Sequence, residues 1–231
     1  MDQFGTAHLL MLALFVVGLP LAYLVGHQER LRGDRRLSKG LAIAVPVVHV
    51  PTQVYDAATG FELGVTLPFH LSDLAWIATA VALWTHHRAA VALTYFWGLV
   101  LTTQAVVTPS LGEDFPDLRF FAYWFIHLLV VWAAVFLVWG HRLAPGWREY
   151  RFTLGVTLAW AVLAYAFNEV ADTNYGYLQR KPSGGSVLDL LGPWPVYVLA
   201  EIAIVATIWA LMTWPWKRKP AGAPRGTSGA S

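Results

Sequence analysis

The chain of 231 residues contains no cysteine and only 13% charged residues, roughly half of the share in an ordinary soluble domain. The absence of cysteine excludes disulfide bonds and thiolate metal sites. The formal net charge of +2 indicates no strongly charged partner by itself, and no nucleic-acid partner is expected. The residues in excess are apolar, at 57% of the chain, which indicates a membrane protein rather than a soluble domain.

The apolar residues fall in blocks of roughly 17–22 residues, the length needed to cross about 30 Å of hydrocarbon at about 1.5 Å per residue. The blocks predict an all-α bundle of seven transmembrane helices, at residues 7–26, 39–56, 68–85, 90–108, 119–140, 151–171 and 194–214. They form one transmembrane domain, 1–216, and the Gly-, Pro- and Ser-rich remainder, 217–231, is predicted to be a disordered basic cytoplasmic tail. No basic segment precedes the first block, so we expect a retained helix rather than a cleaved signal peptide.

The basic residues are divided unequally between the two sets of connecting loops. Thirteen of the 16 Lys and Arg flank one side of the predicted helices: Arg30, Arg32, Arg35, Arg36, Lys39, Arg88, Arg142, Arg148, Arg151, Lys217, Arg218, Lys219 and Arg225. Only Arg119, Arg180 and Lys181 flank the other side. Because cytoplasmic loops carry the excess of Lys and Arg, we expect a multi-pass protein of the cell membrane with its N-terminus outside and its C-terminus in the cytoplasm.

Ten polar side chains inside the predicted helices are the candidates for a site: His49, Gln53, His70, Ser72, Asp73, Gln104, His127, Asn168, Glu169 and Glu201. An ionisable group there costs about 2.5–3.5 kcal/mol on insertion scales, so each one needs a reason. With the predicted orientation, nearly all of them fall in the outer half of the membrane. We therefore expect one polar cavity that six helices share and that opens to the extracytoplasmic side.

Helical spacing limits which of these side chains can face each other. His70 and Asp73 are three residues apart, so both can face one neighbouring helix. Ser72 lies about 200° from His70 at about 3.6 residues per turn, so those two do not share a face. A Ser–His pair would therefore need His127 or His49 from another helix.

Each polar side chain also has a structural interpretation. His49, Gln104 and Asn168 could serve as hydrogen-bonding contacts between helices. Glu169 lies close enough to the surface to be hydrated. Glu201 is deeper, and it could pair with His127 or Asp73 or accept a proton.

Three strings occur in order along the chain: LPFHLSDLAWIATAVAL (67–83), YFWGLVLTTQAVVTPSLGEDFPDLRFFAYWFIHLLVV (95–131) and NYGYLQRKPSGGSVLDLLGPWPVY (174–197). Together they resemble the YwaF-like family of bacterial integral membrane proteins, which is related to the animal transmembrane protein 164. The resemblance implies a seven-helix fold. Through the animal relative it also implies an acyltransferase that remodels phospholipid acyl chains with a membrane-embedded Cys and His.

In that family, the third helix usually carries the motif Pro-x-His-x-Cys. The matching residues here are Pro68, His70 and Ser72, and the resemblance implies that Ser72 stands at the position of the nucleophile. His127 matches the histidine of the fifth helix. A hydroxyl needs an adjacent general base to become a useful nucleophile, which His127 could supply if Asp73 or Glu201 orients it as in a triad.

Three kinds of function fit the polar residues. A phospholipid acyltransferase or lipid-ester hydrolase would use Ser72 as nucleophile, His127 as base, and His70 or Asn168 to stabilise the oxyanion. A small-molecule receptor or transporter would use the same cavity for binding, and the apolar cytoplasmic half favours a receptor over a carrier. A zinc enzyme would use His49, His70 and His127, although the sequence has no compact pair such as HExxH.

Membrane lipids are the expected partners, together with a lipid or acyl substrate if the protein is an enzyme. We expect no metal and no cofactor, and the sequence does not indicate an oligomeric state.

Overall fold

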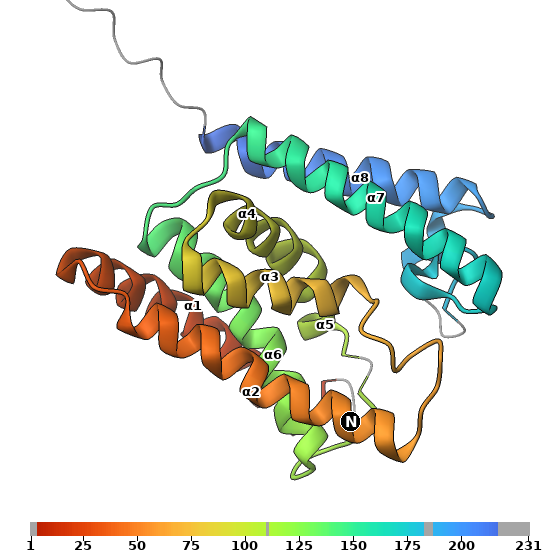
Figure 1. Cartoon of the computed structure of the whole chain (residues 1–231), viewed down its shortest axis with the longest axis horizontal. Helices are drawn as coiled ribbons and strands as arrows, with labels where there is room; N and C mark the ends of the chain where they lie inside the picture. Colours follow the sequence, from red (N-terminus) through yellow and green to blue (C-terminus); the bar gives the residue numbers. More distant parts are fainter. Residues whose placement is uncertain (1–3, 110, 183–186, 217–231) are drawn as a thin grey trace, which may run out of the picture.

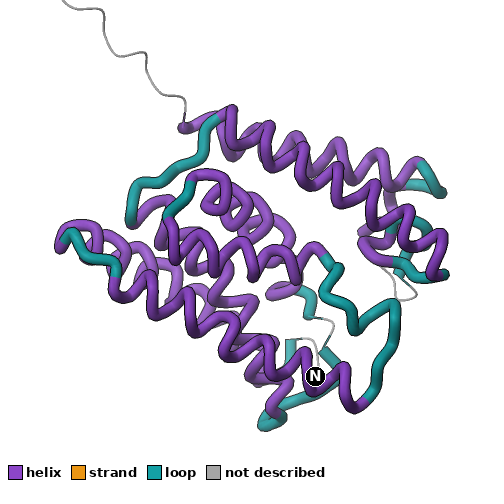
Figure 2. The backbone as a smooth tube through the Cα atoms, viewed as in Figure 1, coloured by secondary structure: helices purple, strands orange, loops and turns teal. Residues whose placement is uncertain are grey.

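The computed structural model describes residues 4–109, 111–182 and 187–216 (Figure 1). Within these ranges the chain contains no β-strand and forms seven helical segments (Figure 2). They are α1 (Thr6–Arg32), α2 (Arg36–Thr59), α3 (Leu71–Thr85), α4 (Arg88–Phe96) continued by η1 (Trp97–Thr102) and α5 (Thr103–Val107), α6 (Leu118–Val135) continued by η2 (Phe136–Gly140), α7 (Trp147–Ala171), and α8 (Val196–Thr213) continued by η5 (Trp214–Trp216). Two short 3₁₀ turns, η3 (Tyr175–Tyr177) and η4 (Val187–Leu191), lie before α8. The all-α prediction is confirmed, whereas the predicted tail at 217–231 lies outside the described residues.

Five of these segments are long and apolar enough to cross a membrane: Thr6–Arg32, Arg88–Val107, Leu118–Gly140, Trp147–Ala171 and Val196–Trp216. The segment α3 is apolar but has only 15 residues. The segment α2 has 24 residues, but polar side chains and two internal prolines dilute its apolar sequence. The fold is therefore that of a multi-pass membrane bundle with five candidate spans by length and composition.

The helices differ in how deeply they lie inside the bundle. In the most apolar 18-residue stretch of Leu118–Gly140, 67% of the residues are buried, whereas in that of Thr6–Arg32 only 11% are buried. Helix α6 with η2 is thus central, and α1, α7 and α8 are peripheral (Figure 1). Large apolar side chains such as Leu10, Val16 and Leu211 are exposed on the peripheral helices, as expected for a surface in contact with lipid.

Glycines allow α1 to approach the central helix closely. A Cβ atom on Gly26 would lie 2.6 Å from the carbonyl oxygen of Phe136, and one on Gly140 would lie 2.8 Å from the Cα atom of Gly26. Two turns earlier, Gly18 faces the indole ring of Trp132. Small residues at such crossings let helix backbones come together, which is the main way in which packing is gained inside a membrane.

One buried carboxylate joins the helix ends on the basic side. The Ser38 amide donates to Glu29 Oε1 at 3.0 Å, and the Ser38 hydroxyl donates to Glu29 Oε2 at 2.6 Å. The same Oε2 atom lies 3.1 Å from His141 Nε2, and the Ser38 hydroxyl lies 3.1 Å from His86 Nε2. Helix α2 has no side-chain cap of its own, so Glu29 satisfies one of its free amide groups from the preceding helix.

This network predicts that the protein loses stability as the pH falls. Burial lowers the pKa of His86 to about 4 from its usual 6.5, and the charges of Arg35 and His141 act in the same direction against Glu29. Burial also lowers the pKa of His141. Because the unfolded chain binds these protons more readily, the stabilisation is complete above about pH 6.5 and is lost as the pH falls towards 4.

The measurement is the melting temperature in detergent between pH 7.5 and pH 4.5. We expect a clear decrease on acidification, and a shallower decrease for His86→Gln, because glutamine can still donate to Ser38 but does not take up a proton. His87→Gln is the control, since His87 lies exposed beside it. Equal slopes for the wild type and His86→Gln would contradict the assignment.

Candidate functional site

Asp73 lies buried near the start of α3, where its carboxylate is held by two donors. The His70 amide donates to Asp73 Oδ2 at 3.0 Å, and the Gln53 side chain donates from Nε2 to Asp73 Oδ1 at 3.0 Å. A carboxylate in the first turn also interacts favourably with the helix dipole. Asp73 thus connects α3 to α2 and places a negative charge between them.

His49 reaches the same carboxylate from α2. Its Nε2 atom lies 3.9 Å from Asp73 Oδ1, and the exposed fractions of the two side chains are 17% and 12%. The ring centroid lies 5.0 Å from that of Trp76. Both ring nitrogens of His49 are buried without a hydrogen-bond partner. A buried polar group without a partner costs about 1–3 kcal/mol, so this imidazole is the group in the site most in need of a ligand.

His127 approaches the site from α6 with a defined tautomer. Its Nδ1 atom lies 2.7 Å from the carbonyl oxygen of Tyr123, and the two rings are 4.0 Å apart. Because a carbonyl oxygen can only accept, Nδ1 carries the proton and Nε2 of the neutral ring carries the lone pair. His49 and Asp73 are both close enough to interact electrostatically with His127. We call the group His49, Gln53, Asp73 and His127 the α2–α3–α6 cluster.

A tyrosine from the loop after α7 covers one side of this arrangement. The rings of His70 and Tyr175 lie 4.6 Å apart, and the Tyr175 hydroxyl donates to the carbonyl of Leu63 at 2.7 Å. Asn168 fixes the tyrosine backbone: its Nδ2 donates to the Tyr175 carbonyl at 3.0 Å, and its Oδ1 accepts from the Tyr175 amide at 2.8 Å. Asn168 therefore holds the Tyr175 loop, and the tyrosine ring contacts His70.

The remaining predicted residues lie apart from the cluster. Ser72 is exposed and makes no side-chain hydrogen bond in the described part of the chain, because it lies about 100° around α3 from the inward-facing Asp73. Gln104 is exposed on α5. Glu169 is exposed and accepts from Gln179 at 2.6 Å. Glu201 lies on the face of α8 that also carries Tyr197 and Trp209.

The structure therefore does not gather the ten predicted side chains into one cavity. It brings His49, Gln53, Asp73 and His127 together, and connects His70 and Asn168 through Tyr175. It does not bring Ser72 to His127, and the expected pairing of Glu201 with His127 or Asp73 is not formed. The helical pattern gives relative angles along one helix, but not the rotation of that helix against its neighbours.

The model of the TMEM164 family matches residues 3–213, nearly the whole chain. The chain belongs to the TMEM164 family. The match confirms the relation to transmembrane protein 164 that the three sequence strings indicate, and it does not separate the YwaF-like branch from the rest. No curated protein and no solved structure matches the chain.

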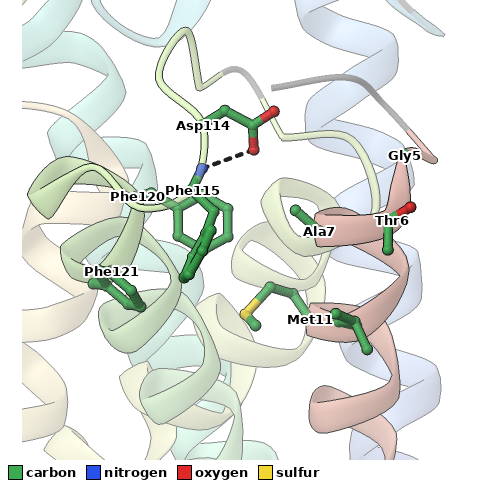
Figure 3. Close-up of a pocket in the computed structure, with 9 residues that line it drawn as sticks. Gly5, Thr6, Ala7, Met11, Asp114, Phe115, Phe120 and Phe121 are labelled. Atoms are coloured by element: carbon green, nitrogen blue, oxygen red, sulfur yellow. Dashed lines mark hydrogen bonds between the residues drawn. The ribbon is translucent and has the colours of Figure 1, made fainter.

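Two cavities in this TMEM164-family chain lie away from the cluster. One, of about 480 Å³, lies between α1 and the start of α6, where Phe115, Phe120 and Phe121 face Ala7 and Met11 (Figure 3). The other, of about 340 Å³, is polar and is lined by Tyr165, Asn168, Glu169, Asp172, Gln179, Arg180 and Trp194. The first is lined mainly by apolar side chains together with Thr6 and Asp114, and the hydrogen bonds of the second hold the loop before α8 in place.

Within residues 4–109, 111–182 and 187–216, no three His, Asp or Glu side chains are arranged to hold a metal ion. His49 reaches Asp73 from α2, whereas His127 bonds the carbonyl of Tyr123 and His70 turns its ring to Tyr175.

Sequence reasoning missed three aromatic residues that shape the site. Tyr123 fixes the tautomer of His127, Trp76 packs on His49, and Tyr175 contacts His70. Tyr123 precedes His127 by four residues, so the helical spacing could have indicated the first contact. The Tyr175 contact spans more than 100 residues of chain, and only the NYGY string, noted for the family resemblance, pointed to this loop.

Proposed function

We propose that the α2–α3–α6 cluster of this TMEM164-family protein acts on a lipid ester, with His127 as the general base. The observation that carries the proposal is the bond from His127 Nδ1 to the Tyr123 carbonyl, which leaves the basic Nε2 lone pair for a substrate proton on a ring that interacts electrostatically with His49 and Asp73. A neutral imidazole in an apolar bundle is suited to take a proton from a hydroxyl group.

The proposed topology places this base within reach of lipid. The seven helical segments alternate in direction, and the division of Lys and Arg residues puts the C-terminus in the cytoplasm and the cluster nearer the outer face. In this topology α2 and α3 cross as well, and the polar cluster between them accounts for the lower hydropathy of α2. A lipid in the outer leaflet would then meet the cluster from the side.

The geometry favours direct attack over a covalent serine intermediate. The hydroxyl of water or of an acceptor lipid gives its proton to His127 Nε2 while its oxygen bonds to the ester carbonyl carbon. The ester C–O bond then breaks, and the proton passes from Nε2 to the leaving alkoxide. A ring N–H of His49, which lacks a partner, can donate to the oxyanion, and Asp73 stabilises the imidazolium that forms.

The test is phospholipid ester turnover by the purified full chain in lipid nanodiscs. We expect His127→Gln to lower the rate by about 100-fold or more, since general-base catalysis contributes about 10²–10⁴-fold. Ser72→Ala is expected to keep the rate within about twofold, because the reaction then needs no serine oxygen. His87→Gln is the matched control for loss of an exposed histidine.

Equal loss in Ser72→Ala and His127→Gln would replace direct attack with a covalent serine mechanism. No turnover by the wild type, in either hydrolysis or acyl exchange, would overturn the enzyme proposal.

Ligand binding without turnover is the second candidate, and the unpartnered nitrogens of His49 favour it. A ligand hydroxyl or amine would satisfy the His49 and His127 rings together, as in a small-molecule receptor. Stabilisation of the wild type against heat by such a ligand, absent in His49→Phe and without turnover, would support this function instead.

A further inference from the structure

The end of α3 meets the start of α2 in a basic junction that is separate from the α2–α3–α6 cluster. The Arg35 guanidinium donates from Nη2 to the carbonyl oxygen of Trp84 at 2.6 Å. The Lys39 Nζ atom lies 5.5 Å from the centre of the Trp84 ring. Two cations therefore contact one tryptophan at a helix end, and indole rings commonly sit at the membrane–water boundary.

No carboxylate neutralises these two cations. Neither Arg35 nor Lys39 forms an ion pair within the described ranges, and the nearby Glu29 is already occupied by Ser38 and His141. The Nε atom of Arg35 is buried and has no hydrogen-bond partner. The junction thus holds an N–H donor and two positive charges that lack an acceptor.

An apolar strip begins at this junction and runs into the bundle surface. On α2, Ile43 and Val47 follow Lys39 at helical spacing, and on α3, Val81 and Ile77 precede Trp84. All four apolar side chains are between 41% and 63% exposed. The two helices are in contact and run in opposite directions (Figure 1), and each row covers about 11–12 Å at about 1.5 Å per residue. The rows therefore run side by side from the same cationic end.

We propose that this junction binds one anionic phospholipid from the leaflet on the basic side of the protein. The phosphate lies between Arg35 and Lys39 and balances their two positive charges, and an acyl chain lies along the strip formed by Ile43, Val47, Ile77 and Val81. A soluble anion would use the two cations only. The continuous apolar strip selects the lipid as the occupant.

The experiment measures lipid retention by native mass spectrometry on the full chain, with phosphatidylglycerol and phosphatidylcholine offered in equal amounts in detergent. We expect the wild type to retain phosphatidylglycerol in preference. Lys39→Gln should lower this preference by about fivefold, and Arg35→Gln with Lys39→Gln by about tenfold or more. The control is the double variant Arg148→Gln and Arg151→Gln, which removes two exposed cations from α7 and should keep the preference.

The Lys39→Gln variant keeps the bond between Arg35 and Trp84, so a loss of lipid preference in this variant is not explained by a folding defect at the junction. A second arm adds inorganic phosphate as a competitor. No preference in the wild type, an equal loss in the α7 control, or displacement of the lipid by millimolar phosphate would each overturn the proposal.

Discussion

Substituting Gly26 by valine is expected to remove most of the folded protein from a purified preparation. The Cβ atom of any residue at this position would lie 2.6 Å from the carbonyl oxygen of Phe136 and 3.2 Å from the Cα atom of Gly140. Real Cβ contacts essentially never fall below 3.0 Å, and here the obstacle is backbone rather than the tip of a flexible side chain. Helix α1 would have to move away from η2 along its whole length.

The cost should exceed the usual range for overpacking, which is about 1–3 kcal/mol, because neither helix backbone can yield locally. Separation of α1 from η2 also breaks the bond from the Arg30 side chain to the carbonyl of Gly140, at 3.1 Å. In a membrane, close backbone contact replaces the hydrophobic drive that holds soluble helices together. No other packing therefore offsets the loss of the close contact between α1 and η2.

The measurement is the yield of monodisperse protein and its melting temperature in detergent. Gly155→Val is the matched control: Gly155 lies within α7, and a Cβ atom there meets nothing within 4 Å. Gly18→Ala should fall between the two, since its Cβ atom meets only the side chain of Trp132. If Gly26→Val and Gly155→Val melted at the same temperature, the close contact of α1 with η2 would be wrong.

The five candidate spans were predictable because one physical length, the thickness of the hydrocarbon, sets the length of an apolar block. Their ends were less predictable where polar residues extend a helix beyond its apolar block. Helix α1 continues to Arg32 rather than ending near residue 26, because Glu29 and Arg30 find acceptors and donors inside the protein. The number of membrane crossings was harder still to predict, since α2 is long enough to cross a membrane but carries polar side chains of the candidate site.

Part of the site was predictable from the free energy that it costs to place an ionisable side chain inside the membrane. A histidine or an aspartate inside an apolar helix needs a partner, and His49, Asp73 and His127 do converge. The position of Gln104 was not predictable, because η1 replaces α-helical turns with wider π turns between residues 97 and 102. A wider turn changes the angular step, so a helical wheel drawn through α4 gives the wrong face for α5.

Nothing in the sequence indicated that Glu29 would be buried. It stands among Arg30, Arg32 and Arg35 at the end of an apolar block, as a solvated flanking residue would. Its burial depends on three other chain segments that meet at the basic side, and no local pattern records such a meeting. Its exposed fraction is 4%, and that of Ser38 is 0%.

Replacing Glu29 by leucine is expected to destabilise the fold by about 3–5 kcal/mol. Leucine is similar in size, but it leaves the Ser38 amide, the Ser38 hydroxyl and the His141 ring N–H without their acceptor. Each buried donor without a partner costs about 1–3 kcal/mol. Glu29→Gln should cost less, because the amide oxygen can still accept from one of them.

A double-mutant comparison separates this hydrogen-bonding role from a simple change of shape. Adding Ser38→Ala to Glu29→Leu removes one of the orphaned donors, so the double variant should melt no lower than Glu29→Leu alone. In the wild-type background, by contrast, Ser38→Ala removes a donor from a buried carboxylate and should lower the melting temperature. Glu169→Leu is the control, since Glu169 is an exposed helical glutamate. Additive losses for Glu29→Leu and Ser38→Ala would show that the two side chains act separately, and the shared network on the basic side would then be wrong.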